Sequence, residues 1–114
     1  HGVGFYLNVH EGPQAISKSN TVKIQEGMIL SNEPGYYKKG KFGIRIENLL
    51  YVNKIKKKLF FENLTLAPID IELINFKILS SKEKDYLFKY HLYTYSKLSK
   101  YLNKNEKKWL ASFI

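Results

Sequence analysis

The 114-residue chain contains no cysteine, which excludes a disulfide framework and any metal site built from thiolates. This absence is compatible with the reducing cytoplasm, where we expect the protein to act. No apolar run approaches the ~20 residues of a membrane-spanning helix, so no membrane partner is expected. Aspartate is also scarce, because Asp70 and Asp85 are the only two and both follow Glu47. Histidine and glutamate are therefore the side chains left to examine for chemistry.

Arginine is nearly absent as well. The chain has a net charge of +9, yet Arg45 is the only arginine among its 19 cationic residues. Nucleic-acid sites that read bases favour arginine, and no basic run here carries stacking aromatics on a known motif. A solvated lysine surface is therefore favoured over a nucleic-acid footprint, and no nucleic-acid partner is expected. The chain opens on His1 rather than methionine, so we expect a fragment or a processed product.

Two carboxylates interrupt runs that otherwise read as buried strands. Glu33 follows one apolar run and precedes the turn signal Pro34-Gly35, and Glu47 lies within a β-branched run that begins at Ile44. The runs at 28–34 and 43–53 are predicted to pair as antiparallel strands. Buried carboxylates need a cationic partner, which Arg45 or a divalent metal could supply. The alternative is a surface ion pair of Glu47 and Arg45, with Glu33 in an exposed loop.

The remaining pattern indicates an α+β architecture, with a twisted antiparallel sheet followed by helices. Alternating apolar residues predict a half-buried strand over 5–9, and further short strands are predicted at 22–24 and 59–62. Residues 80–83 fit a capping box, with Ser80 at the N-cap and Glu83 three residues later. Helical spacing continues from there to residue 102, and a short helix is expected at 106–113. We predict two parts, residues 1–79 and residues 80–114.

The three histidines differ in their setting. His91 lies on the apolar face of the predicted long helix, where a structural role is favoured. His1 and His10 are nine residues apart, and in one extended strand they would be separated by roughly 30 Å. They can share a site only if the glycine-containing segment Gly2 to Gly4 bends sharply.

Four motifs in order resemble a known family. These are HGVGFYLNVHEGP at 1–13, EGMILSNEPGYY at 26–37, FGIRIEN at 42–48 and LTLAPID at 64–70. Together they resemble the C-terminal half of the catalytic domain of Xaa-Pro aminopeptidases. The resemblance implies the pita-bread (creatinase/aminopeptidase) fold, with residues 1–79 as part of the metallopeptidase domain and residues 80–114 as a C-terminal helical extension.

The resemblance also implies a role for five residues. His1 matches a metal-binding histidine at the substrate site, and Glu33 matches a metal ligand that acts as general acid and base. Glu47 matches the glutamate that bridges two metals. His10 matches a histidine that contacts the substrate and stabilises the tetrahedral intermediate, and Arg45 matches a residue that orients the bridging carboxylate.

The implied enzyme holds two divalent ions, most often Mn²⁺ and sometimes Zn²⁺ or Co²⁺, and oxygen-rich ligation with one imidazole suits Mn²⁺. A metal-bridged hydroxide would hydrolyse the bond between an N-terminal residue and a following proline. The implied partners are such a peptide, the upstream half of the same domain and, in the full-length protein, a second copy.

The resemblance also identifies what this chain does not supply. The family needs two further aspartate ligands and another histidine, all upstream of His1. We therefore expect this chain alone to be inactive, with one of the two glutamates raised in pKa by the repulsion of the other. The alternative is a non-catalytic pita-bread remnant of a split gene that acts at most as a protein-binding module.

Overall fold

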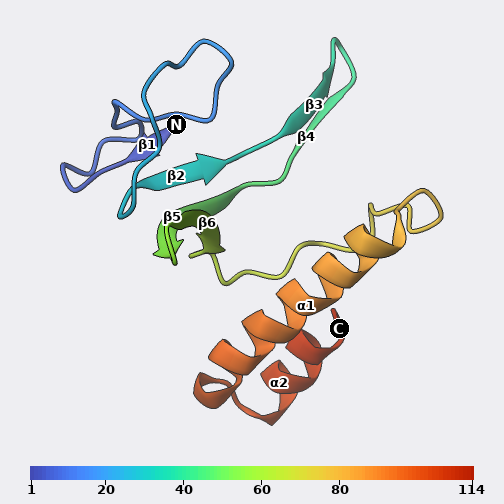
Figure 1. Ribbon diagram of the computed structural model, residues 1–114. Helices are drawn as coiled ribbons and strands as arrows, with labels where there is room; N and C mark the ends of the chain where they lie inside the picture. Colours follow the sequence, from blue (N-terminus) through green and yellow to red (C-terminus); the bar gives the residue numbers. More distant parts are fainter. The chain divides into compact units, whose positions relative to one another are not determined.

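A computed structural model describes residues 1–114, which form two compact units, His1–Thr65 and Leu66–Ile114. The first unit contains a four-stranded antiparallel sheet and a separate two-stranded hairpin (Figure 1). In spatial order, the sheet consists of β1 (Gly2–Val3), β2 (Ile29–Asn32), β5 (Asn48–Ile55) and β6 (Lys58–Asn63). The hairpin is β3 (Gly35–Lys38) with β4 (Phe42–Arg45).

The core of the sheet lies on one face of β2 and β5. Side chains alternate along β5, and Asn48, Leu50 and Val52 are the buried set. Leu30 of β2 pairs with Leu50, and Leu30 and Val52 are fully buried. Burying one such side chain stabilises a fold by roughly 1.5–3 kcal/mol.

The predicted run at 43–53 forms two strands rather than one. Pairing to β3 ends at Arg45, and pairing to β2 begins at Asn48. The predicted antiparallel arrangement is therefore confirmed, but Ile46 and Glu47 lie between the strands. Here the chain passes from the hairpin to the four-stranded sheet.

The strand predicted over residues 5–9 is wrong. Leu7 has a φ of 64°, and the side chains of Phe5, Leu7 and Val9 are 82%, 90% and 79% exposed. The buried Glu11 explains the difference, because its carboxylate accepts hydrogen bonds from the Tyr6 backbone N–H at 3.2 Å and from Asn8 Nδ2 at 3.3 Å. These local bonds close a loop where a strand would need ladder partners. The short strand predicted at 22–24 is absent too.

The second unit contains α1 (Ser81–Leu98), a 3₁₀ turn at Ser99–Tyr101 and α2 (Lys104–Ala111). The predicted capping box is confirmed, since Ser80 Oγ accepts from the Glu83 N–H and Glu83 Oε2 accepts from the Ser80 N–H at 2.7 Å. Asn103 and Glu106 form a second capping box that begins α2 at residue 104, before the predicted 106. No helix here combines the length and apolarity needed to cross a membrane.

His91 is structural, as its position on the apolar helix face indicated. Its Nε2 accepts a hydrogen bond from the Ile69 backbone N–H at 3.0 Å, so Nδ1 carries the proton donated to the Phe113 carbonyl at 2.7 Å. Tyr90 also donates to the Ala67 carbonyl at 2.7 Å. The segment after residue 65 is therefore bonded to α1 and belongs to the second compact unit, Leu66–Ile114.

Candidate metal centre

Strand register brings His1 and Glu33 to the same end of the sheet. Because Gly2 pairs with Leu30, His1 lies beside Ser31, whose backbone N–H donates to the His1 carbonyl at 2.8 Å. Glu33 leaves β2 directly after Asn32. The predicted approach of residue 1 to the glutamate motif therefore follows from the pairing of β1 with β2.

The same register places Glu47 opposite Glu33. Asn32 pairs with Asn48 in the sheet, and Gly35 pairs with Arg45 in the hairpin. Both glutamates therefore lie where the chain crosses between the sheet and the hairpin. The crossing is tied by the Ile46 N–H, which donates to the Pro34 carbonyl at 3.3 Å. Two carboxylates are thereby held face to face by backbone pairing.

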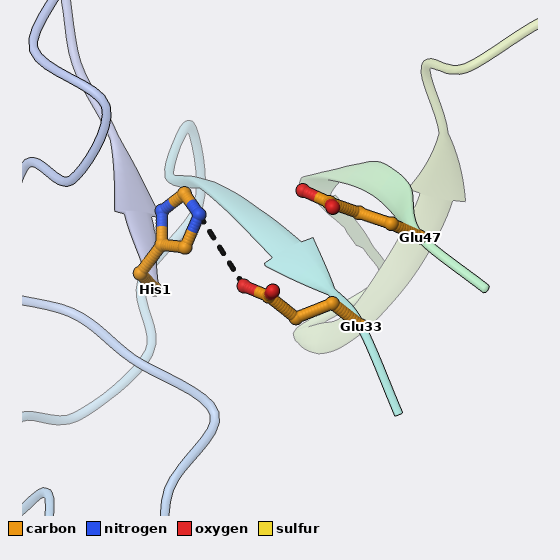
Figure 2. A group of neighbouring side chains, drawn as sticks. All are labelled: His1, Glu33 and Glu47. Carbon is orange, nitrogen blue, oxygen red and sulfur yellow. Dashed lines mark ion pairs between the residues drawn. The ribbon is translucent and has the colours of Figure 1, made fainter. Parts of the chain in front are cut away.

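The side chains of His1, Glu33 and Glu47 converge, as Figure 2 shows. One ligand atom from each of the three lies within 4.8 Å of the other two. His1 and Glu33 are partly buried, whereas Glu47 is exposed. Neither Asp70 nor Asp85 belongs to this group.

The contacts of the imidazole fit a cation at this position. His1 Nδ1 lies 2.8 Å from the Gly2 carbonyl oxygen, which can only accept, so Nδ1 carries a proton. Nε2 lies 3.3 Å from Glu33 Oε1. A lone pair facing a carboxylate oxygen repels it, whereas a shared proton or a divalent cation stabilises the pair. A metal-ligating histidine is typically oriented in this way through its other nitrogen.

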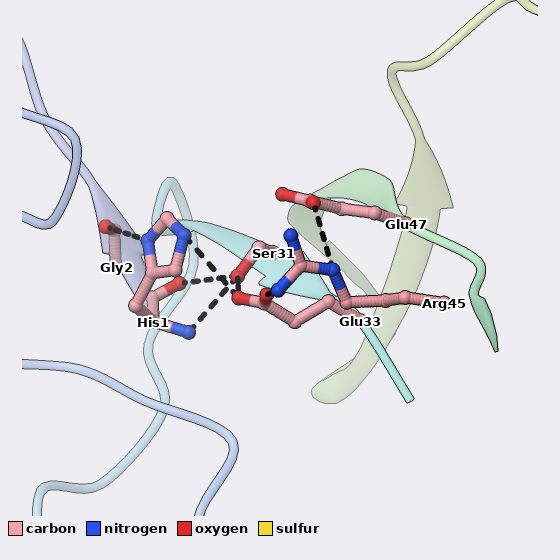
Figure 3. Close-up of polar contacts among 6 residues, drawn as sticks. All are labelled: His1, Gly2, Ser31, Glu33, Arg45 and Glu47. Carbon is pink, nitrogen blue, oxygen red and sulfur yellow. Dashed lines mark hydrogen bonds and ion pairs between the residues drawn. The ribbon is translucent and has the colours of Figure 1, made fainter. Parts of the chain in front are cut away.

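Arg45 lies between the two carboxylates (Figure 3). Its Nη1 is 3.3 Å from Glu33 Oε2, and its Nε is 3.9 Å from Glu47 Oε2. The guanidinium is about half exposed, so it reaches the site from the solvent side. The predicted contact of Arg45 with the site carboxylates is therefore confirmed.

The expectation of a raised glutamate pKa is wrong for Glu33, whose pKa is lowered from its ordinary value of 4.5. The main cause is the Ser31 hydroxyl, which donates to Glu33 Oε1 at 2.7 Å. Desolvation opposes this effect, and the positive charge of Arg45 adds to it. The expectation rested on the repulsion between Glu33 and Glu47. It did not include the hydrogen bond from Ser31, two residues before Glu33.

His10 joins the site through the loop that Glu11 closes. The ring centroids of His1 and His10 are 4.3 Å apart, and their planes meet at 71°. The predicted bend between the two histidines is therefore present. His10 is not one of the three convergent groups, so it borders the site without adding a fourth ligand.

Tyr37 and Ser31 were missed by the sequence analysis. The Tyr37 ring lies across Gly35 and Gly43, where a Cβ would approach ring atoms to 2.8 Å and 2.6 Å, respectively. Its hydroxyl lies at Gly35, the residue paired with Arg45. The available signal was the two glycines, which share one face of the hairpin with the tyrosine. Ser31 offered no comparable signal.

The donor set fits a divalent cation. One imidazole and two carboxylates are ligands that Mn²⁺, Zn²⁺ and Co²⁺ accept, and their mutual approach is what a shared ion requires. Three groups supply only part of the coordination of such an ion, because zinc takes four ligands and harder ions take six or more. The three side chains are therefore an incomplete ligand set.

Known protein families match almost the whole chain. Residues 1–54 match metallopeptidase family M24, and residues 57–112 match the C-terminal region of peptidase_M24. Between them, the two matches contain every residue of the convergent group and both helices.

Individual relatives show the same likeness. A probable Xaa-Pro aminopeptidase P of Laccaria bicolor is 44% identical over 110 residues, covering 87% of this chain and 17% of the relative. Aminopeptidase P2 of Arabidopsis thaliana is 46% identical over 121 residues, covering 96% of this chain and 17% of the relative. The chain thus spans about a fifth of the length of the curated relatives it matches.

A solved structure shares the fold. The X-prolyl aminopeptidase of Caenorhabditis elegans, described as a cytosolic enzyme with a di-nuclear active site, superposes with a TM-score of 0.84 at 38% identity. The match covers 98% of this chain and 20% of that chain. The likeness in fold and in sequence therefore extends over the residues of both units.

Proposed function

The chain belongs to metallopeptidase family M24, and from this premise we propose that it forms the C-terminal part of the active site of an Xaa-Pro aminopeptidase. The predicted α+β fold, the C-terminal half of a pita-bread domain with a helical extension, is confirmed. Relatives named Xaa-Pro aminopeptidases are 41–46% identical and support this substrate class. The proposed substrate is a peptide with proline in its second position.

The proposed ligands are His1, Glu33 and Glu47, and the observation that carries the proposal is their approach to within 4.8 Å. Glu47 and Glu33, together with His1, would hold the divalent ions through their carboxylate and imidazole groups. Mn²⁺ is the metal we expect, with Zn²⁺ and Co²⁺ as substitutes. When bound, the two ions lower the pKa of a water molecule and polarise the carbonyl under attack.

The remaining roles follow from the positions of the side chains. Glu33 has a lowered pKa and is ionised near neutral pH, so it can accept a proton from the nucleophile and return it to the leaving nitrogen. Arg45 holds both glutamates in position through its two contacts. His10, whose ring packs against His1, can donate a hydrogen bond to the oxyanion, while His1 borders the substrate.

The 114-residue chain is proposed to be inactive by itself. Its two aspartates lie outside the convergent group, so two anionic ligands must come from an upstream half of the domain. We call the chain joined to such a half the extended chain. We further propose a cytoplasmic location and a homodimer for the extended chain.

The test compares Mn²⁺ binding and Xaa-Pro cleavage by the two chains. The extended chain should bind Mn²⁺ tightly and cleave the peptide, and the 114-residue chain should bind weakly and show no turnover. In the extended chain, Glu33→Ala should lower kcat/KM by about 10²–10⁴, the usual contribution of a general acid–base group, or more. Glu26→Ala is the matched control, because Glu26 is an exposed glutamate outside the group.

Two outcomes would overturn parts of this proposal. Turnover by the 114-residue chain alone, abolished by Glu33→Ala, would show that upstream aspartates are dispensable. An extended chain that binds no Mn²⁺ and cleaves no Xaa-Pro peptide would favour the non-catalytic alternative, a protein-binding remnant.

A further inference from the structure

The β3–β4 hairpin leads directly out of the metal centre. β3 begins two residues after Glu33, and β4 ends two residues before Glu47. Every residue of both strands is exposed, and the hairpin pairs with no strand of the larger sheet. In Figure 1 it projects beyond the end of β2. The hairpin is therefore an arm attached to the site at its base.

The arm carries a concentrated positive charge at its tip. Lys38, Lys39 and Lys41 surround the turn, in which Gly40 has a φ of 68°. The stretch from Pro34 to Ile46 contains no acidic residue, and none of the three lysines forms an ion pair. Nothing within the hairpin neutralises the tip.

The length of the arm matches the reach of a bound peptide. A four-residue strand rises by about 3.4 Å per residue, so the tip lies roughly 10–15 Å from the hairpin base. An extended peptide covers the same distance in about three to five residues. We propose that the lysine tip, defined as Lys38, Lys39 and Lys41, selects peptide substrates that carry acidic residues about three to five positions after the proline. This inference rests on the proposed peptidase function.

The β5–β6 hairpin provides an internal control for this idea. Its tip is equally basic, with Lys56, Lys57 and Lys58 in sequence. It lies at the far end of β5, an eight-residue strand that starts beside Glu47 and runs away from the site. That distance is about twice the length of the β3–β4 arm, so a peptide bound at the site would need about twice as many residues to reach this second tip.

The expected preference is electrostatic and moderate. Exposed charges separated by several ångströms of water interact weakly, so three lysines should favour two glutamates over two glutamines by about three- to tenfold in kcat/KM. The preference should disappear at high salt, because screening removes interactions between exposed charges.

The experiment uses the Mn²⁺-loaded extended chain and three peptides that share proline at position two. The peptides carry glutamate, glutamine or lysine at their fifth and sixth positions. The glutamate peptide should be preferred at low salt. A triple Lys→Gln variant of the lysine tip should equalise the three peptides, and a triple Lys→Glu variant should favour the lysine peptide. Lys→Gln changes at 56, 57 and 58 should leave the preference intact.

A binding measurement separates this inference from the proposed function. Fluorescence anisotropy of a labelled glutamate peptide on the metal-free extended chain should show binding that the lysine-tip variant weakens and the control variant keeps. Cleavage of all three peptides at equal rates would overturn the inference while leaving the peptidase proposal standing. Absence of any Xaa-Pro cleavage would overturn the peptidase proposal. Equal binding by the tip and control variants would overturn the lysine-tip role whether or not cleavage occurs.

Discussion

The rings of His1 and His91 have the same kind of contact at Nδ1 and different contacts at Nε2. In each ring Nδ1 faces a backbone carbonyl, Gly2 at 2.8 Å for His1 and Phe113 at 2.7 Å for His91. Nε2 of His91 then accepts the Ile69 N–H, whereas Nε2 of His1 faces the Glu33 carboxylate. His91 is 2% exposed, and the His1 side chain is 21% exposed.

This difference separates the structural His91 from His1, the proposed metal ligand. When a buried N–H occupies the second nitrogen, the ring has no remaining lone pair for chemistry, and it tightens the fold. When a carboxylate faces that nitrogen, the pair has an affinity for a proton or a metal ion. The partner of the second nitrogen therefore indicates the role better than burial alone.

The largest effect that would test this comparison comes from His1→Ala in the extended chain. Loss of a ligand should weaken Mn²⁺ binding by at least about 100-fold, since even residues that only orient ligands contribute 10–100-fold. Thermal unfolding should change little. Calorimetric metal titration measures the loss, with His10→Ala as the control that keeps the affinity. If His1→Ala lowered the thermal stability and left the Mn²⁺ affinity unchanged, His1 would be a structural residue like His91.

The converse change, His91→Ala, should act on stability alone. It removes two hydrogen bonds and leaves the part-buried Ile69 N–H without a partner, which should cost about 3 kcal/mol. Urea unfolding followed by helical circular dichroism measures the cost. Lys89→Ala is the control, because its ion pair with Asp85 is exposed and worth little. An unchanged unfolding midpoint would contradict the structural assignment.

A smaller effect is expected from Arg45→Lys. Lysine keeps the charge but cannot span Glu33 and Glu47 with a planar fork, so the orientation of both carboxylates should loosen. Mn²⁺ affinity should fall by about tenfold, the lower end of the range for residues that orient ligands. Parallel titration of Lys54→Arg, a charge-conserving change on β5 outside the group, is the matched control. An affinity equal to that of the unmodified chain would refute the orienting role.

The sequence predicted the elements whose signals are local. The capping box at Ser80 and Glu83 and the hairpin that returns along β6 are determined by neighbouring residues. The strand predicted at 5–9 failed because Glu11 bonds back to the backbone there, and alternation of apolar residues cannot reveal that bond. Periodicity likewise gave no sign of the break before Asn48.

The candidate site was predicted in its chemical groups but not in its electrostatics. Glu33 and Glu47 were identified as carboxylates within strand runs, and His1 through the family resemblance. Strand register then explains why they meet. Ser31 was missed because it acts through a contact that only folded geometry reveals. For Tyr37 the two facing glycines were the available signal. A serine hydroxyl aimed at a carboxylate is indistinguishable in sequence from any other strand serine.

The chain passes between the four-stranded sheet and the β3–β4 hairpin twice, and this arrangement constrains the site. Glu33 and Glu47 lie on the two chain segments that form this junction, and the bond from the Ile46 N–H to the Pro34 carbonyl ties those segments together. Strand register in the sheet on one side and in the hairpin on the other constrains the same junction. The two carboxylates are therefore preorganised, because backbone pairing on both sides sets their spacing.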